Sequence, residues 1–269
     1  MERVSILGLP VDLMTMSETL HRIQEILDGP PCGRQMLTAN AEMVVAAQHD
    51  AQLSHIWQEA AYVVADGYGL VWAASRMGYP LPERIAGVEL VGEICRLSAE
   101  EGYRLYFLGA KPGVAEEARA RLLLKYPKAR IVGTHHGYFT PKETKSIVDD
   151  IHNKGTDVLF AALGAPQQEK WIYANRLTTG IRLGIGVGGS FDVWAGRVSR
   201  APKWMREHGL EWLYRLCQQP KRLPRMRSLP IFVWMVQRAE RAQVAQDMAA
   251  ATGDDPSPDT GIKNRSKQG

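Results

Sequence analysis

Between residues 103 and 189 the chain alternates short apolar runs with segments of helical periodicity, and this alternation constrains its fold more than any other feature. We expect strands at 104–108, 129–133, 158–163 and 182–187, separated by helices at 113–125, 141–154 and 167–176. Strands that alternate with helices of about 10–15 residues form parallel sheets with helices on both faces. The predicted fold class is therefore α/β, a doubly wound, Rossmann-like parallel sheet flanked by helices.

The first hundred residues continue this pattern less densely. Strands are expected at 4–7, 35–38 and 62–65, and helices at 17–27 and 41–48. Ser17 is the expected N-cap of the first of these helices. Together these elements predict one α/β core over residues 1–195.

Past Gly196 no strand pattern remains. Residues 200–245 have a helical and basic composition, and Pro220, Pro224 and Pro230 are expected to interrupt the helices. Beyond them, the chain has few apolar residues. We therefore expect a basic helical appendage over 196–245 and a disordered tail over 246–269.

The appendage differs from the core in charge. Between Gly196 and Arg241 there are eleven Lys or Arg and three Asp or Glu, a balance of +8, so the rest of this +4 chain carries −4. A basic end on an acidic body indicates an anionic partner. Trp204, Trp212 and Trp234 lie among these cations, a mixture that suits a membrane interface or single-stranded nucleic acid. A solvated basic helix without a partner is the third interpretation.

The cysteines and the apolar segments argue against several classes of protein. The three cysteines are odd in number and widely spaced, which argues for a reducing compartment and against a disulfide framework or a zinc site. His135-His136 has no Cys, Asp or Glu at ligand spacing. The start of the chain lacks a signal peptide, and the apolar run 229–236 is far shorter than the roughly 20 residues that cross a bilayer. A cytoplasmic protein without a membrane span is expected.

Glycines end several of the expected strands. Gly109, Gly164 and Gly188-Gly189 stand where a ligand phosphate would meet a helix N-terminus, at the carboxyl end of the sheet. Each alone is better explained as a tight turn, but together they favour a nucleotide-binding crevice. The run 184–189 also matches G-x-G-x-x-G, yet its first glycines fall inside the expected strand, so a dinucleotide site is only weakly indicated.

Polar residues follow two other strands. Thr38 and Asn40 end one strand, and Asp66-Gly67 ends another, so their side chains are expected in the same crevice. Asp66 is a candidate general base, although an Asp that caps the next helix is an equally good interpretation. Gln167, Gln168 and Glu169 open the helix after Gly164 and can hydrogen-bond a sugar or uracil, although such residues are ordinary in a first helical turn.

The chain resembles the WecG/TagA/CpsF glycosyltransferase family, and most of all its TagA branch, over residues 1–240. The motifs that carry this resemblance, in order, are Thr38-x-Asn40-x-Glu42, Asp66-Gly67, Glu83-Arg84-x-x-Gly87, Leu108-Gly109, His136-Gly137-Tyr138-Phe139, Gly164-x-Pro166-x-Gln168-Glu169, Gly186-x-Gly188-Gly189-x-Phe191-Asp192, Arg200-Ala-Pro202 and Gly209-Leu-Glu211-Trp212.

The resemblance implies an inverting transferase of ManNAc from UDP-ManNAc to the 4-hydroxyl of GlcNAc-diphospho-undecaprenol, in wall teichoic acid synthesis. It implies a Rossmann-like fold of unusual topology and no metal or cofactor, the UDP-sugar being a substrate. By the same resemblance Asp66 is the base, Thr38 is catalytic, and Arg215, Arg222 and Arg225 meet the diphosphate. The remaining residues expected to bind substrate are Asn40, Gly67, Arg84, Gly109, Gly164, Gln167, Gln168, Glu169, Gly188, Gly189 and Asp192.

The expected partners follow from this reaction. They are a UDP-N-acetylhexosamine donor, a polyprenyl-diphosphate-linked GlcNAc acceptor and the anionic inner face of the cell membrane, where the protein is expected to be peripheral. Nucleic acid is not expected, and apolar residues of the appendage favour homo-oligomers away from the membrane. The alternatives are transfer of another UDP-hexosamine or its uronic acid in exopolysaccharide synthesis, a nucleotide-binding oxidoreductase, and a nucleic-acid-binding protein.

Overall fold

A six-stranded parallel sheet forms the centre of the molecule, as the α/β prediction required. The computed structural model describes residues 2–218 and 223–252. The strand order is β4-β3-β8-β7-β5-β6, and every neighbouring pair is parallel. The strands are β3 (Arg34–Ala39), β4 (Tyr62–Ala65), β5 (Arg104–Gly109), β6 (Arg130–His135), β7 (Val158–Ala162) and β8 (Leu183–Gly186). All six carboxyl ends therefore lie at one edge of the sheet.

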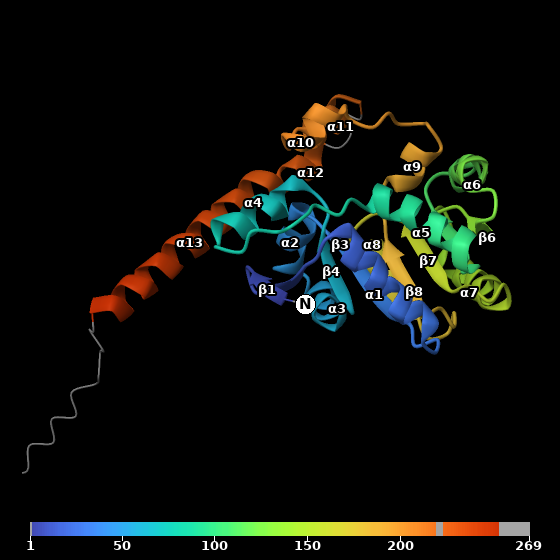
Figure 1. Ribbon diagram of the computed structural model, residues 1–269, viewed down its shortest axis with the longest axis horizontal. Helices are drawn as coiled ribbons and strands as arrows, with labels where there is room; N and C mark the ends of the chain where they lie inside the picture. Colours follow the sequence, from blue (N-terminus) through green and yellow to red (C-terminus); the bar gives the residue numbers. More distant parts are fainter. Residues whose placement is uncertain (1, 219–222, 253–269) are drawn as a thin grey trace, which may run out of the picture.

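Helices cover both faces of this sheet, which gives three layers (Figure 1). Successive strand residues face opposite layers, so Phe107 packs in the core on one face and Tyr106 in the core on the other. Because both faces are covered, β7 is buried along its whole length. The helices on the Phe107 face are α1 (Met16–Asp28), α5 (Gly87–Glu101), α6 (Val114–Lys125) and α9 (Ser190–Trp194), and those on the other face are α2 (Ala41–Ala47), α3 (Ala51–Glu59), α7 (Thr144–Asn153, after the 3-10 turn Pro141–Glu143) and α8 (Gln167–Asn175).

The N-terminus forms a two-stranded hairpin where a single strand at 4–7 was expected. Strand β1 (Glu2–Ile6) pairs antiparallel with β2 (Leu9–Leu13) through a turn at Leu7 and Gly8. Both turn residues have positive φ, as a two-residue hairpin turn needs. The sequence pattern did not indicate this hairpin, because Leu7 is unusual at a turn position with positive φ and Pro10 is unusual within a strand. The following helix is also capped two residues early, by Thr15 in a capping box with Glu18, and not by Ser17.

The segment between β4 and β5 contains two helices that were not predicted. They are α4 (Tyr68–Arg76) and α5, and the loop between them returns to the sheet. The backbone amide of Ile85 donates to the carbonyl of Ala65, the last residue of β4, at 2.9 Å. The start of α5 therefore lies directly beside the carboxyl end of β4.

The appendage is helical, as expected, but it is not separate from the core. It contains α10 (Lys203–Glu207), α11 (Glu211–Gln218), α12 (Leu223–Met226) and α13 (Ser228–Thr252). Pro230 does not interrupt α13, because it lies in the first turn, where no amide hydrogen bond is lost. Phe232 and Val236 are fully buried in the core cluster that includes α2 and α4.

The first part of α13 lies beside α4 and α2, and its last turns extend beyond the body (Figure 1). The helix continues to Thr252, past the expected end of the appendage at 245. Residues 219–222, including Pro220 and Arg222, and residues 253–269 of the expected tail lie outside the described residues. Within the described part of the chain, no helix combines the length and apolar character needed to cross a membrane.

Candidate active site

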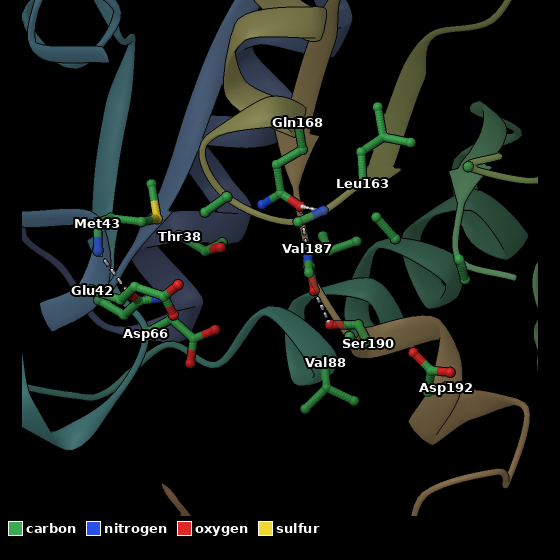
Figure 2. A pocket seen from close by; sticks show the side chains of 18 of the residues that line it. Thr38, Glu42, Met43, Asp66, Val88, Leu163, Gln168, Val187, Ser190 and Asp192 are labelled. Atoms are coloured by element: carbon green, nitrogen blue, oxygen red, sulfur yellow. Dashed lines mark hydrogen bonds between the residues drawn. The ribbon is translucent and has the colours of Figure 1, made fainter. Parts of the chain in front are cut away.

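A polar pocket of about 810 Å³ lies at the carboxyl ends of the strands. Its walls are the residues that follow each strand together with the start of α9, and Figure 2 shows the carboxyl groups of Asp66 and Glu42 on one side and that of Asp192 on the other. Eight predicted site residues line it: Thr38, Asn40, Asp66, Gly164, Gln168, Gly188, Gly189 and Asp192. The parallel topology thus brings together predicted residues as far apart in the chain as Thr38 and Asp192.

Asp66 lies at the junction of β4 and α5. Its backbone amide donates to the carbonyl of Ala39 at 2.7 Å, and its Oδ2 accepts from the amide of Gly87, the first residue of α5, at 3.1 Å. A helix N-terminus stabilises an anionic side chain. The main chain of Asp66 is therefore fixed to β3, and its carboxylate, which lines the pocket, is held by the first amide of α5.

Two hydroxyl groups share the space around Gly87 with Asp66. A Cβ atom at Gly87 would lie 3.4 Å from Asp66 Oδ2 and 3.6 Å from both Thr38 Oγ1 and Ser190 Oγ. The Thr38 hydroxyl donates to the carbonyl of Gly186 at 2.7 Å, and the Ser190 hydroxyl donates to that of Val187 at 2.6 Å. Each hydroxyl uses its proton on the protein, so toward the pocket each presents acceptor lone pairs.

Asn40 has a structural function in addition to its place in the pocket. It is the N-cap of α2, and its Oδ1 accepts from the amide of Met43 at 3.0 Å. Because this bond uses the amide oxygen, the Nδ2 group is the part of Asn40 that can bind a substrate oxygen.

A second pocket, of about 490 Å³, adjoins the first beneath the appendage. The two pockets share Asn40, Glu42 and Asp66. The second is lined largely by apolar and aromatic side chains from α4, α11 and α13, among them Trp72, Trp212 and Phe232. Asp66 is therefore accessible from two different cavities.

Ion pairs connect the appendage to the core around this second pocket. Arg84, which lines it together with Gly67, contacts Glu211 of α11 at 3.1 Å (Nη1 to Oε2), and both side chains are mostly buried. Arg200 and Arg206 converge on one oxygen of Glu89, at 2.6 and 3.3 Å. The sequence-predicted Arg84 is thus an appendage contact as well as a pocket residue.

Of the predicted residues whose side chains the structure describes, three lie outside both pockets. Gly109 is needed for close packing, because a Cβ there would approach the backbone of Ala162 to 2.5 Å, and its φ is +130°. Gln167 is exposed on the outer side of the first turn of α8. Glu169 is fully buried and lines neither pocket, whereas it was expected to hydrogen-bond a sugar or uracil.

The three arginines expected at the diphosphate are not placed by side chain. Arg222 lies outside the described residues, and so do the side chains of Arg215 on α11 and Arg225 on α12. Gln218, the last residue of α11, does line the main pocket. The appendage therefore reaches over the crevice at least at this residue.

The sequence analysis gave no site function to several pocket residues, namely Lys111, Tyr138, Ser190 and Gln218. Lys111 follows the strand-ending Gly109 by two residues and Ser190 follows Gly189 directly, so a search one turn beyond each glycine would have found them. Nothing in the local pattern indicates Gln218, which comes from the appendage.

The glycine run is not a dinucleotide fingerprint. Gly184 and Gly186 lie within β8, where a Cβ would approach Ile172 of α8 to 2.4 Å and Gln168 to 2.5 Å, respectively. These glycines allow the helix to pack on the strand, which removes the motif on which the oxidoreductase alternative depended. Within the described residues, no three His, Cys, Asp or Glu side chains form a group able to hold a metal ion.

Comparison with known proteins identifies the family. Residues 4–246 match the glycosyl transferase WecG/TagA/CpsF family. The N-acetylglucosaminyldiphosphoundecaprenol N-acetyl-beta-D-mannosaminyltransferases of Staphylococcus aureus strains MRSA252 and MW2 are each 35% identical to it over 241 residues, 89% of this chain and 94% of the relative. With a family match over most of its length and relatives at this identity, the chain belongs to the WecG/TagA/CpsF family of glycosyl transferases.

Proposed function

We propose that this glycosyltransferase moves ManNAc from UDP-ManNAc to the 4-hydroxyl of GlcNAc-diphospho-undecaprenol, with inversion to a β-linkage, in wall teichoic acid synthesis. The family membership and the names of the relatives support this reaction. The UDP-sugar is a substrate, and the proposal includes no cofactor.

The observation that carries the proposal is the pair of pockets that meet at Asp66. A transferase has to hold two substrates so that their reacting atoms touch. The polar pocket, at about 810 Å³, is within the usual 300–1,000 Å³ of ligand sites and suits a nucleotide sugar. The pocket of about 490 Å³ beneath the appendage has the apolar walls that the start of a prenyl chain requires. Asp66 belongs to both.

In the proposed reaction the acceptor hydroxyl oxygen attacks the anomeric carbon while Asp66 takes its proton. The bond between that carbon and the UDP oxygen breaks, and UDP leaves from the opposite face, which inverts the configuration. A carboxylate positioned at the attacking hydroxyl contributes about 10²–10⁴-fold to such a step. Thr38 and Ser190, which share the space around Gly87 with Asp66, present lone pairs to the sugar hydroxyls.

The leaving diphosphate gains negative charge that the protein has to stabilise. Lys111 lines the donor pocket, and Arg84 lines the acceptor pocket beside Asp66. Preorganised cations and helix N-termini are effective at this position, because they do not need to reorganise during the reaction. In this proposal the arginines of the appendage, Arg215, Arg222 and Arg225, complete the set when the acceptor arrives.

The appendage is proposed to contact the membrane in which the acceptor lies. Its exposed large apolar side chains include Trp204, Trp212, Leu223 and Trp234. Arg238 lies over the Trp234 ring, with 5.4 Å from the guanidinium carbon to the ring centroid. Aromatic rings next to cations suit the headgroup region of an anionic bilayer. The protein would then act as a peripheral membrane enzyme.

A donor screen tests the proposal. The purified chain would be incubated with a short-chain GlcNAc-diphospholipid and, separately, UDP-ManNAc, UDP-GlcNAc and UDP-ManNAc uronic acid, with products measured by mass. We expect a product that is one N-acetylhexosamine heavier, with UDP-ManNAc as the preferred donor. Preference for the uronic acid would replace the proposed donor, and no transfer to the lipid acceptor with any donor would contradict the proposed reaction.

A further inference from the structure

Glu169 is a buried acid with no part in the reaction described above. It lies in the first turn of α8 and is fully inaccessible to solvent. Its Oε1 accepts from Gln168 Nε2 at 2.8 Å, and among the described residues its Oε2 has no hydrogen-bond partner. A buried carboxyl group is costly to the fold unless its environment compensates for the lost hydration. The function of Glu169 is therefore sought in its hydrogen bond to the neighbouring Gln168.

Gln168 connects two of the turns that form the donor pocket. Its Oε1 accepts from the amide of Gly164 at 3.2 Å and from that of Gly188 at 3.1 Å. Gly164 follows β7 and Gly188 follows β8, so one amide oxygen holds together the ends of two adjacent strands. Figure 2 shows Gln168 pointing into this edge of the pocket.

The orientation of the Gln168 amide depends on Glu169. Two backbone N–H groups face one end of the amide, and that end must be the oxygen. The other end must be the NH₂ group, and Glu169 Oε1 is the acceptor that receives one of its two hydrogens. Among the described residues the second hydrogen of this NH₂ group has no acceptor, and Gln168 lines the main pocket.

Strand β8 leaves room for the hydrogen-bonded pair of Gln168 and Glu169. A Cβ at Gly186 of β8 would lie 2.5 Å from both Gln168 Nε2 and Glu169 Oε1, so only glycine accommodates the pair. From β3, Gln35 Nε2 donates to the backbone carbonyl of Glu169 at 3.1 Å, which fixes this turn of α8 against the sheet. The pair is therefore built into the contact between α8 and two strands.

The charge state of Glu169 follows from its surroundings. Burial raises the pKa of Glu169 to about 7, the hydrogen bond from Gln168 opposes this, and the charge of Glu42 on α2 adds to it. The next residue on α8, Lys170, is paired with Asp50, the N-cap of α3, at 2.6 Å. Below pH 7 the group is mainly a neutral acid, whose carbonyl oxygen still accepts from Gln168.

We propose that Glu169 is a positioning residue, which orients the Gln168 amide so that Gln168 holds the Gly164 and Gly188 turns around the donor diphosphate and offers it one N–H. This inference rests on the proposed use of the main pocket for a UDP-sugar. It assigns Glu169 no contact with the substrate.

The test compares Glu169→Gln with Glu169→Met by UDP titration calorimetry and by steady-state kinetics. Glutamine keeps an acceptor oxygen in place, so UDP affinity and kcat should stay within about threefold of the wild type. Methionine fills the space but accepts no hydrogen bond, so UDP affinity should fall about tenfold, the equivalent of one net hydrogen bond. Glu100→Gln and Glu100→Met, at an exposed site in the last turn of α5, are matched controls.

A double-mutant cycle separates positioning from a merely structural function. In a Gln168→Ala background, Glu169→Met should change UDP affinity less than twofold, because its effect passes through Gln168. Equal losses in both backgrounds, or no loss for Glu169→Met alone, would overturn the inference. If the wild type itself fails to bind UDP, the proposed donor site fails too, and the two failures are thus distinguishable.

Measurements of thermal stability test whether unfolding causes the loss of UDP affinity in Glu169→Met. The folded-state pKa of Glu169, about 7, lies above the ordinary value of 4.5, so the folded protein holds the proton more tightly than the unfolded chain. The contribution of Glu169 to stability is then fully present below pH 4.5 and is lost as the pH rises through 7. As the pH rises from 5 to 8, the Tm of Glu169→Met should therefore increase relative to that of the wild type, although the variant binds UDP more weakly. A Tm difference that does not change with pH would contradict the buried neutral acid.

Discussion

The two walls of the proposed catalytic crevice are held in place by different kinds of contact. The core wall is made of strand ends, and its functional groups are fixed by the backbone, as in the bond from the Gly87 amide to Asp66. The appendage wall is held by the ion pairs of Arg84 and Glu89 and by the buried Phe232 and Val236. The first wall is preorganised by the whole sheet, whereas a few contacts determine whether the second is in place. Mutations in the core wall are therefore expected to lower the rate of the chemical step, and mutations in the appendage wall to weaken the docking of the appendage.

The largest effect is expected in the core wall, at Asp66. Asp66→Asn keeps the shape and can still accept from Gly87, but it removes the basicity, so kcat should fall about 10²–10⁴-fold. Affinity for UDP should remain, because the donor pocket is otherwise intact. Single-turnover kinetics and UDP titration measure the two quantities. A variant that keeps more than about a tenth of wild-type turnover would mean that another group is the base.

The next largest effect is expected at the anchor of the appendage. Phe232 is 1% exposed and packs in the core cluster with α2 and α4. In a protein core, Phe→Ala costs about 3–5 kcal/mol of stability. Because Phe232 joins α13 to the core, Phe232→Ala should weaken the docking of α13. Turnover with the lipid acceptor should drop about 10–100-fold, while UDP affinity changes little.

Val244→Ala, on an exposed part of the same helix, is the matched control and should behave as wild type. If Phe232→Ala weakens UDP binding as strongly as turnover, the two walls are not separable. Removal of the whole appendage at Gly196 would be a poorer test of this separation. It would uncover the apolar face of α2 and α4 that Phe232 and Val236 now cover.

What the sequence predicted well was local. Strand β4 was placed at its observed bounds, and Asp66 and Thr38 were placed in one crevice, because apolar runs and their polar ends are properties of short segments. The second pocket was not predictable, since its walls come from α4, α11 and α13 and meet only after folding. The complete burial of Glu169 was not predictable for a related reason. A first-turn residue can face solvent, a ligand or the sheet, and only the packing of α8 on Gly186 decides between them.

A smaller effect is expected from charge-conserving changes in the appendage. The functions of Arg215, Arg222 and Arg225 remain predictions from the family resemblance. Lysine keeps the charge but cannot form bidentate bonds to a phosphate. Each Arg→Lys change should therefore lower turnover about tenfold and leave co-sedimentation with anionic vesicles almost unchanged.

Vesicle binding itself should weaken as salt rises, because a Debye length of about 8 Å at physiological ionic strength screens the surface charges. Arg241→Lys, near the outer part of α13, serves as the control for a cation outside the crevice. Parallel loss of vesicle binding and turnover in all three variants, or loss of neither, would make the cluster a surface anchor only.

The smallest expected effect is from metal removal, where we expect no change at all. In this enzyme the charge on the leaving UDP is assigned to Lys111, arginines and helix N-termini, and the sequence has no DxD-like motif at a strand end. Glu42 and Asp66 are the place to test this, because both line the two pockets, and Mg²⁺ often binds one or two carboxylates plus substrate phosphates. Turnover should be equal in EDTA, Mg²⁺ and Mn²⁺, and Glu42→Gln should not create a metal dependence. Activity that EDTA abolishes and Mg²⁺ restores would move the stabilisation of the diphosphate from the cationic groups to a metal held at the core wall, and the appendage would then lose its proposed part in the chemistry.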